Sequence, residues 1–254
     1  QNGADVNAVE EDKWTALHVA ARHEYVDVAK VLIPSGTDVN AVDKYKWTAL
    51  HYAVFYGNVN IAKVLLQNGA DVNAVDKEEK TTLHIAVWYR RDECVNVLLQ
   101  NGVDVNAVDK EEMTALHNAA ERGRVDVAKV LIQNGADVNA VERLGESALH
   151  FAARIGHVGV AKVLIQNGAD ANVVGRNGSK PLDYVVPSRN RVGFTLKLLC
   201  IGVEVEKILE QDRKFLLPIS ERINLLRDTN RIGSSLMSNE ERHFMRHVAW
   251  FLDQ

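Results

Sequence analysis

This chain has few prolines and cysteines and no large excess of charge of either sign. Its 254 residues include four prolines and two cysteines, and 30 lysines and arginines oppose 34 aspartates and glutamates, for a formal net charge of −4. This balance is not that of a protein with a broad nucleic-acid-binding surface, and 46% hydrophobic residues are too many for a disordered chain. We therefore expect a folded chain with no nucleic-acid partner.

Long apolar runs are also absent, and no secretory signal opens the chain. The longest runs, such as 31–33 and 198–201, are far shorter than the roughly 18 to 20 residues that cross a membrane. Cys94 and Cys200 stand in apolar helical contexts and form no metal-ligand or redox motif. We expect a cytoplasmic chain in a reducing compartment, with no membrane partner and no disulfide.

A short motif recurs through most of the chain with a period of 33 residues. The segment Thr-Ala-Leu-His at 15–18 returns, with small changes, at 48–51, 81–84, 114–117 and 147–150. Glycine recurs with the same period at positions 36, 69, 102, 135 and 168. A fixed period between about 20 and 50 residues is typical of solenoids, in which each unit stacks on its neighbours.

Each repeated unit contains two short helical patterns. In the fourth unit one apolar stripe runs over 115–120 and a broader one over 127–132. Thr114 is placed to cap the first helix, and Gly123 and Gly135 suit the left-handed conformations that end the two helices. Neither helix can bury its apolar face alone, so we expect stacked units to share one continuous core.

These features resemble the ankyrin repeat family, whose units read Thr-Pro-Leu-His-x-Ala-Ala, then Gly, then Leu-Leu, then Gly-Ala-x-x-Asn. The match is close over 1–174, weakens over 175–203 and stops after about Val203. The near-identical units are similar to arrays from intracellular bacteria. The resemblance implies an all-α solenoid of 33-residue helix-turn-helix units with β-turn or hairpin tips. It also implies protein–protein interaction, with a concave surface that holds the partner.

The resemblance divides the chain into two parts. Residues 1–203 are predicted to form a partial first repeat, five full repeats and a degenerate last repeat, and 204–254 a helical C-terminal extension that caps the array. Because Gln1 begins in the middle of a unit, we expect a fragment of a longer array or an unusual cap. Alternatively, Leu217-Pro218 and the apolar residues after it are faintly similar to F-box-like segments, which would make the extension a docking domain.

The repeated histidines form no predicted metal site. Neighbouring repeats stand about 8 to 10 Å apart, whereas zinc holds its nitrogen ligands at about 2 Å. In the ankyrin family this histidine hydrogen-bonds the turn of its own or of the next repeat. No nucleophile has an activating context and no phosphate-binding loop follows a strand pattern. We expect no catalytic residue, no metal, no cofactor, and a monomer that is not an enzyme.

Positions that differ between near-identical units are free to carry recognition. The residue before each Thr-x-Leu-His segment reads Trp14, Trp47, Lys80, Met113 and Glu146. Aromatic residues at this position, at the end of the first helix and at one turn tip are confined to 14–89. Outward-facing aromatic clusters typically mark interaction surfaces, although some of these side chains could fold back over their neighbours. The predicted partner-binding residues are Trp14, Arg22, Tyr45, Trp47, Phe55, Tyr56, Trp88, Tyr89, Arg90, Met113 and Arg122.

Departures from the repeat occur in the same region. Glu24 and Arg90 stand where other units have glycine, and a non-glycine residue at positive φ costs about 1 kcal/mol. Arg90 and Arg91, continued by Arg122 and Arg124, are expected to give the aromatic patch a basic rim. The turn-tip glycine usual in the family is also replaced, which leaves the geometry of these turns open, by Lys13, Lys46, Glu79 and Glu112.

The sequence favours a non-enzymatic module that binds a peptide or protein partner, and the resemblance to arrays from intracellular bacteria implies a fragment of a host-directed effector. One alternative is a substrate adaptor whose C-terminal helices dock a ubiquitin-ligase component. The other is the targeting region of a larger enzyme whose catalytic domain lies outside these residues.

Overall fold

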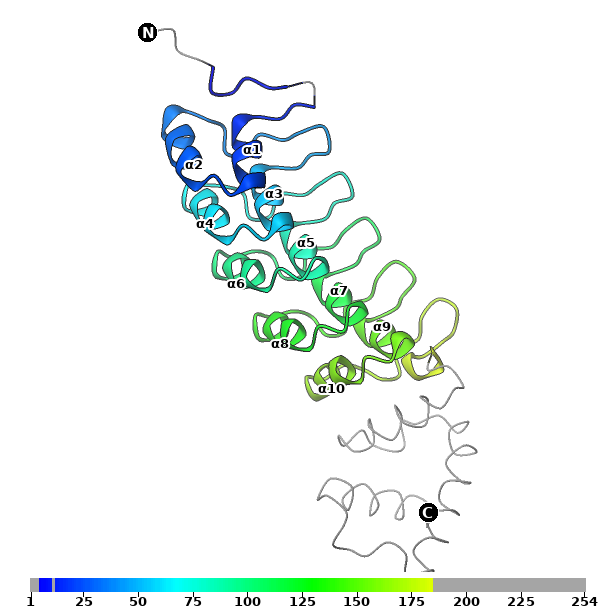
Figure 1. The fold of residues 1–254 in the computed structure, drawn as a ribbon. Helices are drawn as coiled ribbons and strands as arrows, with labels where there is room; N and C mark the ends of the chain where they lie inside the picture. The colour runs from blue at the N-terminus through cyan, green and yellow to red at the C-terminus, as the bar shows by residue number, and fades with distance from the viewer. Residues whose placement is uncertain (1–4, 11, 185–254) are drawn as a thin grey trace, which may run out of the picture.

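The computed structural model describes residues 5–10 and 12–184, which fold into a stack of paired helices (Figure 1). The inner row consists of α1 (Ala16–His23), α3 (Ala49–Tyr56), α5 (Thr82–Trp88), α7 (Ala115–Glu121) and α9 (Ala148–Ile155). The outer row consists of α2 (Val26–Leu32), α4 (Val59–Gln67), α6 (Asp92–Gln100), α8 (Val125–Gln133) and α10 (Val158–Gln166). Two short 3₁₀ helices, η1 (Ile33–Ser35) and η2 (Pro181–Tyr184), complete the described elements.

The helix pairs lie side by side, and long turns project on the side of the inner row (Figure 1). Each inner helix packs on its own outer helix and on the next inner helix. Within the described residues, β-pairing is limited to isolated bridges between Val75 and Thr81 and between Val141 and Ser147, so the tips are turns with little or no hairpin. The predicted all-α solenoid is confirmed.

The inner helices begin at the repeated Thr-x-Leu-His segment because that segment is a capping box. The hydroxyl of Thr114 accepts the backbone N–H of His117 at 3.4 Å, and His117 Nδ1 accepts the backbone N–H of Thr114 at 3.1 Å. The other four inner helices begin with the same reciprocal pair, with Ser147 in place of threonine in the last. The predicted cap at Thr114 is therefore confirmed.

The core is one continuous layer between the two rows. Each inner helix contributes one leucine that is at most 2% exposed, and the five are Leu17, Leu50, Leu83, Leu116 and Leu149. Alanines such as Ala86 and Ala119 are fully buried beside them, which lets neighbouring inner helices approach closely. Burying a leucine contributes about 1.5 to 3 kcal/mol, so this column is a main source of stability that passes from unit to unit.

The turn tips keep one backbone conformation whether or not glycine is present. Lys46 and Glu79 have φ of 62° and 60°, and Gly145 occupies the equivalent position with φ of 75°. The turns that lack the glycine usual in the family therefore retain its left-handed conformation. Glu24 and Arg90 also have positive φ, at 57° and 60°, as their alignment with glycines predicts.

Several predictions from sequence fall outside the described residues. These include the degenerate repeat beyond residue 184, the helical extension at 204–254 with its cap and docking alternatives, and Cys200. Cys94 is a free, buried cysteine, and burial raises the pKa of its thiol to about 11. Among the described helices, none has the length and apolar character of a membrane span.

Candidate protein-interaction surface

The repeated histidines fix the residues that the sequence predicts to be recognition positions. Since Nδ1 of each histidine accepts the capping N–H, Nε2 carries the proton and can donate it to a carbonyl in the next unit. His18 Nε2 lies 3.0 Å from the carbonyl oxygen of Trp47, and His84 Nε2 lies 2.9 Å from that of Met113. The hydrogen bond to the next repeat that the family resemblance implies is confirmed for four of the five histidines. Each such bond fixes the backbone of the residue that precedes the next Thr-x-Leu-His segment.

Burial keeps these histidines neutral. The side chains of His51 and His117 are at most 1% exposed, and desolvation lowers their pKa from the usual 6.5 to about 4. The pKa values of His18, His84 and His150 are lowered for the same reason. His51 differs from the others because its Nε2 is buried without a hydrogen-bond partner among the described residues.

An aromatic cluster connects the first three helix pairs. Tyr52 lies between Trp14 and Trp47, with ring centroids 4.7 and 5.0 Å away. Its hydroxyl donates to Asp43 Oδ2 at 2.7 Å, and burial together with this carboxylate raises the pKa of Tyr52. Phe55 continues the cluster from Trp47, at 5.4 Å, to Tyr89, at 4.5 Å.

The structure divides the predicted partner-binding residues into two groups. Tyr45, Tyr56 and Tyr89 are 52%, 40% and 45% exposed, and the side chains of Arg22, Arg90 and Arg122 are also exposed. The half-buried group consists of Trp14, Trp47, Phe55, Trp88 and Met113.

The expectation that the predicted aromatics face outward without serving the core is wrong for part of this second group. Trp14, Trp47, Phe55 and Met113 pack against the hydrophobic core and keep only part of their surface in solvent. The Trp14 ring reaches Tyr52 of the next unit, and the Trp47 ring contacts Tyr52 and Phe55 of α3, the helix that follows it.

Arginines of the chain itself lie over several aromatic faces. The guanidinium of Arg22 lies 5.5 Å from the ring centroid of Trp14 and 5.7 Å from that of Tyr56. Arg122 lies closer, at 3.5 Å from the ring centroid of Trp88. All three contacts are within the range of cation–π attraction, so the chain's own arginines cover part of these aromatic faces.

The predicted basic rim is only partly present. Arg91 Nε donates to the carbonyl oxygen of Phe55 at 2.9 Å, and Arg124 is buried, where it pairs with Asp92 and reaches the carbonyl oxygen of Val87. These two arginines therefore bind the last turn of the preceding inner helix. They do not line the aromatic patch, because unpaired helix-end carbonyls are strong acceptors. Only Arg90 and Arg122 remain at the surface.

A groove of about 470 Å³ lies on the inner face, between the turns and inner helices of the third and fourth helix pairs. Trp47, Trp88, Tyr89 and Met113 provide much of its apolar lining. Six carboxylates also line it, from Asp76, Glu78, Asp109, Glu111, Glu121 and Glu142, against one lysine, Lys80. The surface is therefore an aromatic groove with an acidic lining.

Comparison with known families identifies the fold. Family models described as ankyrin repeats match residues 2–76 and 72–142, with three copies, and 131–185, with many copies. The chain belongs to the ankyrin repeat family. It is similar to the crystal structure of the ankyrin repeat domain of Bcl-3, "a unique member of the IkappaB protein family". The two share 30% sequence identity and a TM-score of 0.70, over 76% of this chain and 86% of that one. No curated protein sequence matches the chain.

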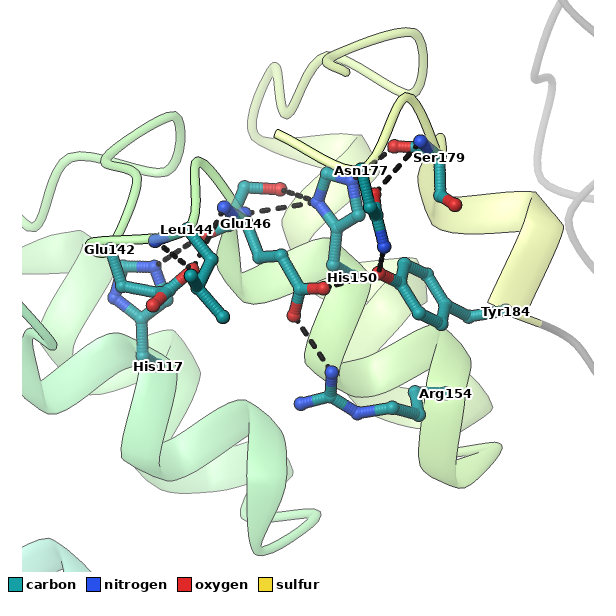
Figure 2. Close-up of polar contacts among 10 residues, drawn as sticks. His117, Glu142, Leu144, Glu146, His150, Arg154, Asn177, Ser179 and Tyr184 are labelled. Carbon is teal, nitrogen blue, oxygen red and sulfur yellow. Dashed lines mark hydrogen bonds and ion pairs between the residues drawn. The ribbon is translucent and has the colours of Figure 1, made fainter. Parts of the chain in front are cut away.

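Beyond the groove, the inner face of the ankyrin array is occupied by its own polar contacts. Figure 2 shows the carboxylate of Glu146 between Arg154 and Tyr184. Arg154 Nη1 donates to it at 2.7 Å, the Tyr184 hydroxyl donates to its other oxygen, and Asn177 donates to the Tyr184 oxygen. The hydrogen bond to Glu146 raises the pKa of Tyr184. This internal pairing engages both carboxylate oxygens of Glu146.

Sequence reasoning missed the acidic lining of the ankyrin groove. Glu78 and Glu111 occupy equivalent turn positions 33 residues apart, so their alignment alone places them in neighbouring units. Asn118 is a second missed residue of the lining. The same internal comparison could have found it, because the residue after each repeated histidine is apolar or aromatic in the other four units.

Proposed function

We propose that the ankyrin array is a non-enzymatic module that binds a peptide or protein partner in the groove of its inner face. Ankyrin repeats generally act as protein-interaction scaffolds, which supports the general role. The observation that carries the location is the groove itself, where Trp88 and Tyr89 keep aromatic surface in solvent beside a hollow of about 470 Å³. Partly exposed aromatic anchors beside a concave surface are typical of binding sites.

Trp88 is the most informative residue for a test. It lines the groove and is half-buried, yet it does not belong to the set of side chains that pack on the hydrophobic core. Trp47 also lines the groove, but it packs on that core and donates its indole N–H to Asp76 Oδ2 at 3.3 Å. Truncation of Trp88 therefore removes binding surface with the smaller effect on folding.

The experiment is a selection of random peptides on the full chain, followed by affinity measurements with variants. We expect peptides to be enriched and to bind the Trp88→Ala variant about 30-fold more weakly, which corresponds to about 2 kcal/mol for a buried aromatic anchor. Lys63→Ala, an exposed change on outer helix α4, serves as the control and should leave affinity unchanged. Failure to enrich any peptide, or equal losses in both variants, would contradict the proposal.

A further inference from the structure

The groove carries negative charge that the chain balances only in part. Glu78 pairs with Lys110 at 3.6 Å and Glu111 pairs with Arg143 at 3.3 Å, and both ion pairs are exposed and therefore weak. The other four lining carboxylates, those of Asp76, Asp109, Glu121 and Glu142, form no ion pair with the described residues. A cationic ligand is the occupant that this charge favours.

Asn118 places an unused amide in the lining of the groove. It is 5% exposed and lines the groove, and among the described residues only its backbone groups form hydrogen bonds. The equivalent positions hold Val19, Tyr52, Ile85 and Phe151, so the fold does not require a polar group here. The amide is not sealed from the groove, so a ligand there can reach it and hydrogen-bond it.

Asp109 adds a second unused acceptor. Its Oδ1 accepts the backbone N–H groups of Glu111 and Met113, each at 3.0 Å. In the two preceding turns the second carboxylate oxygen is also satisfied, since Tyr52 donates to Asp43 and Trp47 donates to Asp76. Asp109 Oδ2 has no such donor among the described residues, although Asp109 is 6% exposed.

The indole of Trp88 gives the groove an aromatic wall that suits a planar cation. Arg122 of the chain itself holds its guanidinium 3.5 Å from the centroid of this ring. Guanidinium groups stack on aromatic faces and present five N–H donors in one plane, whereas an ammonium group is compact and strongly hydrated. The aromatic wall and the two acceptors, Asp109 Oδ2 and the Asn118 side-chain oxygen, therefore both favour a guanidinium group.

We propose that the groove binds an arginine side chain presented by an extended segment of the partner. The guanidinium takes the place of Arg122 against the Trp88 wall, donates to Asp109 Oδ2 and to the Asn118 side-chain oxygen, and is balanced by Glu111 and Glu121. This inference rests on the proposed function, since it names the chemistry of the partner at the same groove.

The test uses three synthetic peptides of the sequence Gly-Ser-Gly-X-Gly-X-Gly-Ser, in which X is arginine, lysine or citrulline. Binding to the full chain is measured by calorimetry. We expect the arginine peptide to bind at least 10-fold more tightly than the other two, because lysine lacks the planar fork and citrulline lacks the charge. Equal affinity for arginine and lysine, or no binding of the arginine peptide up to millimolar concentration, would overturn the inference.

Two variants with matched controls locate the arginine. Asn118→Val introduces the residue that Val19 provides at the equivalent position, so we expect the fold to be retained and the arginine peptide to bind at least 10-fold more weakly. Glu111→Gln should weaken binding at least threefold, whereas Glu112→Gln, at an exposed neighbour outside the lining, should change it less than twofold. Wild-type affinity in Asn118→Val, or equal losses in the two glutamate variants, would contradict the assignment.

The peptide selection separates this inference from the proposed function. Enriched peptides that need Trp88 but contain no arginine would leave the groove as a binding site and overturn the arginine assignment. Peptides that bind independently of Trp88 would overturn the proposed function itself.

Discussion

The buried histidines make the stability of this ankyrin array depend on pH in a defined window. The pKa of His51 and of His117 is about 4 in the folded chain, against 6.5 for an ordinary histidine. Between these two values the unfolded chain binds protons that the folded chain does not. The contribution of these two histidines to the free energy of unfolding is therefore constant above about pH 7 and falls as the pH decreases from about 6.5 towards 4.

The size of the loss follows from the two pKa values. A shift of one unit corresponds to about 1.4 kcal/mol, so each of these two histidines accounts for about 3 kcal/mol over the whole window. At pH 5 the loss per histidine is about 2 kcal/mol, or about 4 kcal/mol for the pair. A change of that size is a large fraction of the stability of a typical domain.

The assay is urea unfolding followed by circular dichroism at pH 7.5 and pH 5, with the wild type beside a His51→Gln, His117→Gln double variant. Glutamine keeps a capping-box partner at these positions but does not titrate. We expect the difference in unfolding free energy between the two pH values to be about 4 kcal/mol smaller in the variant. The reasoning is refuted if both proteins lose the same amount.

Three further predictions are checked by the same unfolding assay at neutral pH. Tyr52→Phe leaves Asp43 Oδ2 without its donor and should lower the unfolding free energy by about 1 to 3 kcal/mol. Tyr56→Phe, at an exposed position, should lower it by less than about 0.5 kcal/mol, and similar losses in the two variants would contradict the role of the Tyr52 hydroxyl. Asp92→Ala should lower the unfolding free energy by at least about 1 kcal/mol more than Arg124→Met does, because it leaves the buried Arg124 side chain, 8% exposed, without its counterion, whereas Arg124→Met leaves Asp92, 60% exposed, in contact with water. The reverse order would show that burial does not govern this ion pair. Lys46→Gly should raise the unfolding free energy by up to about 1 kcal/mol by relieving the left-handed conformation at φ of 62°, and a decrease would count against strain at this turn.

The fold was predictable from sequence because its determinants are local and repeated. Thr114 and His117 form their cap within one turn of helix, and the same pair recurs every 33 residues. The roles of Arg91 and Arg124 were not predictable in this way, because each reaches a carbonyl 36 or 37 residues away. Whether such a side chain points outward or back across the stack depends on the spacing of two neighbouring units.

The candidate surface was predictable only in part for a related reason. The columns of variable residues identified Trp88 and Tyr89, which do line the groove. Trp47 is half-buried because it contacts Tyr52 and Phe55, and a comparison of equivalent positions between repeats does not reveal such contacts. The groove itself arises from residues of four successive turns and two inner helices, so its acidic character appears only when those elements are placed together.

The constant backbone of the turn tips makes the chemistry of this array transferable from one unit to another. Lysine, glutamate and glycine occupy the same left-handed position without altering the path of the chain. The three tip residues 77–79 could therefore replace 44–46 in the preceding unit, where Asp43 and Trp47 on either side would be kept. New binding preferences can arise in such a protein by exchange or duplication of short segments, while the scaffold that presents them stays the same.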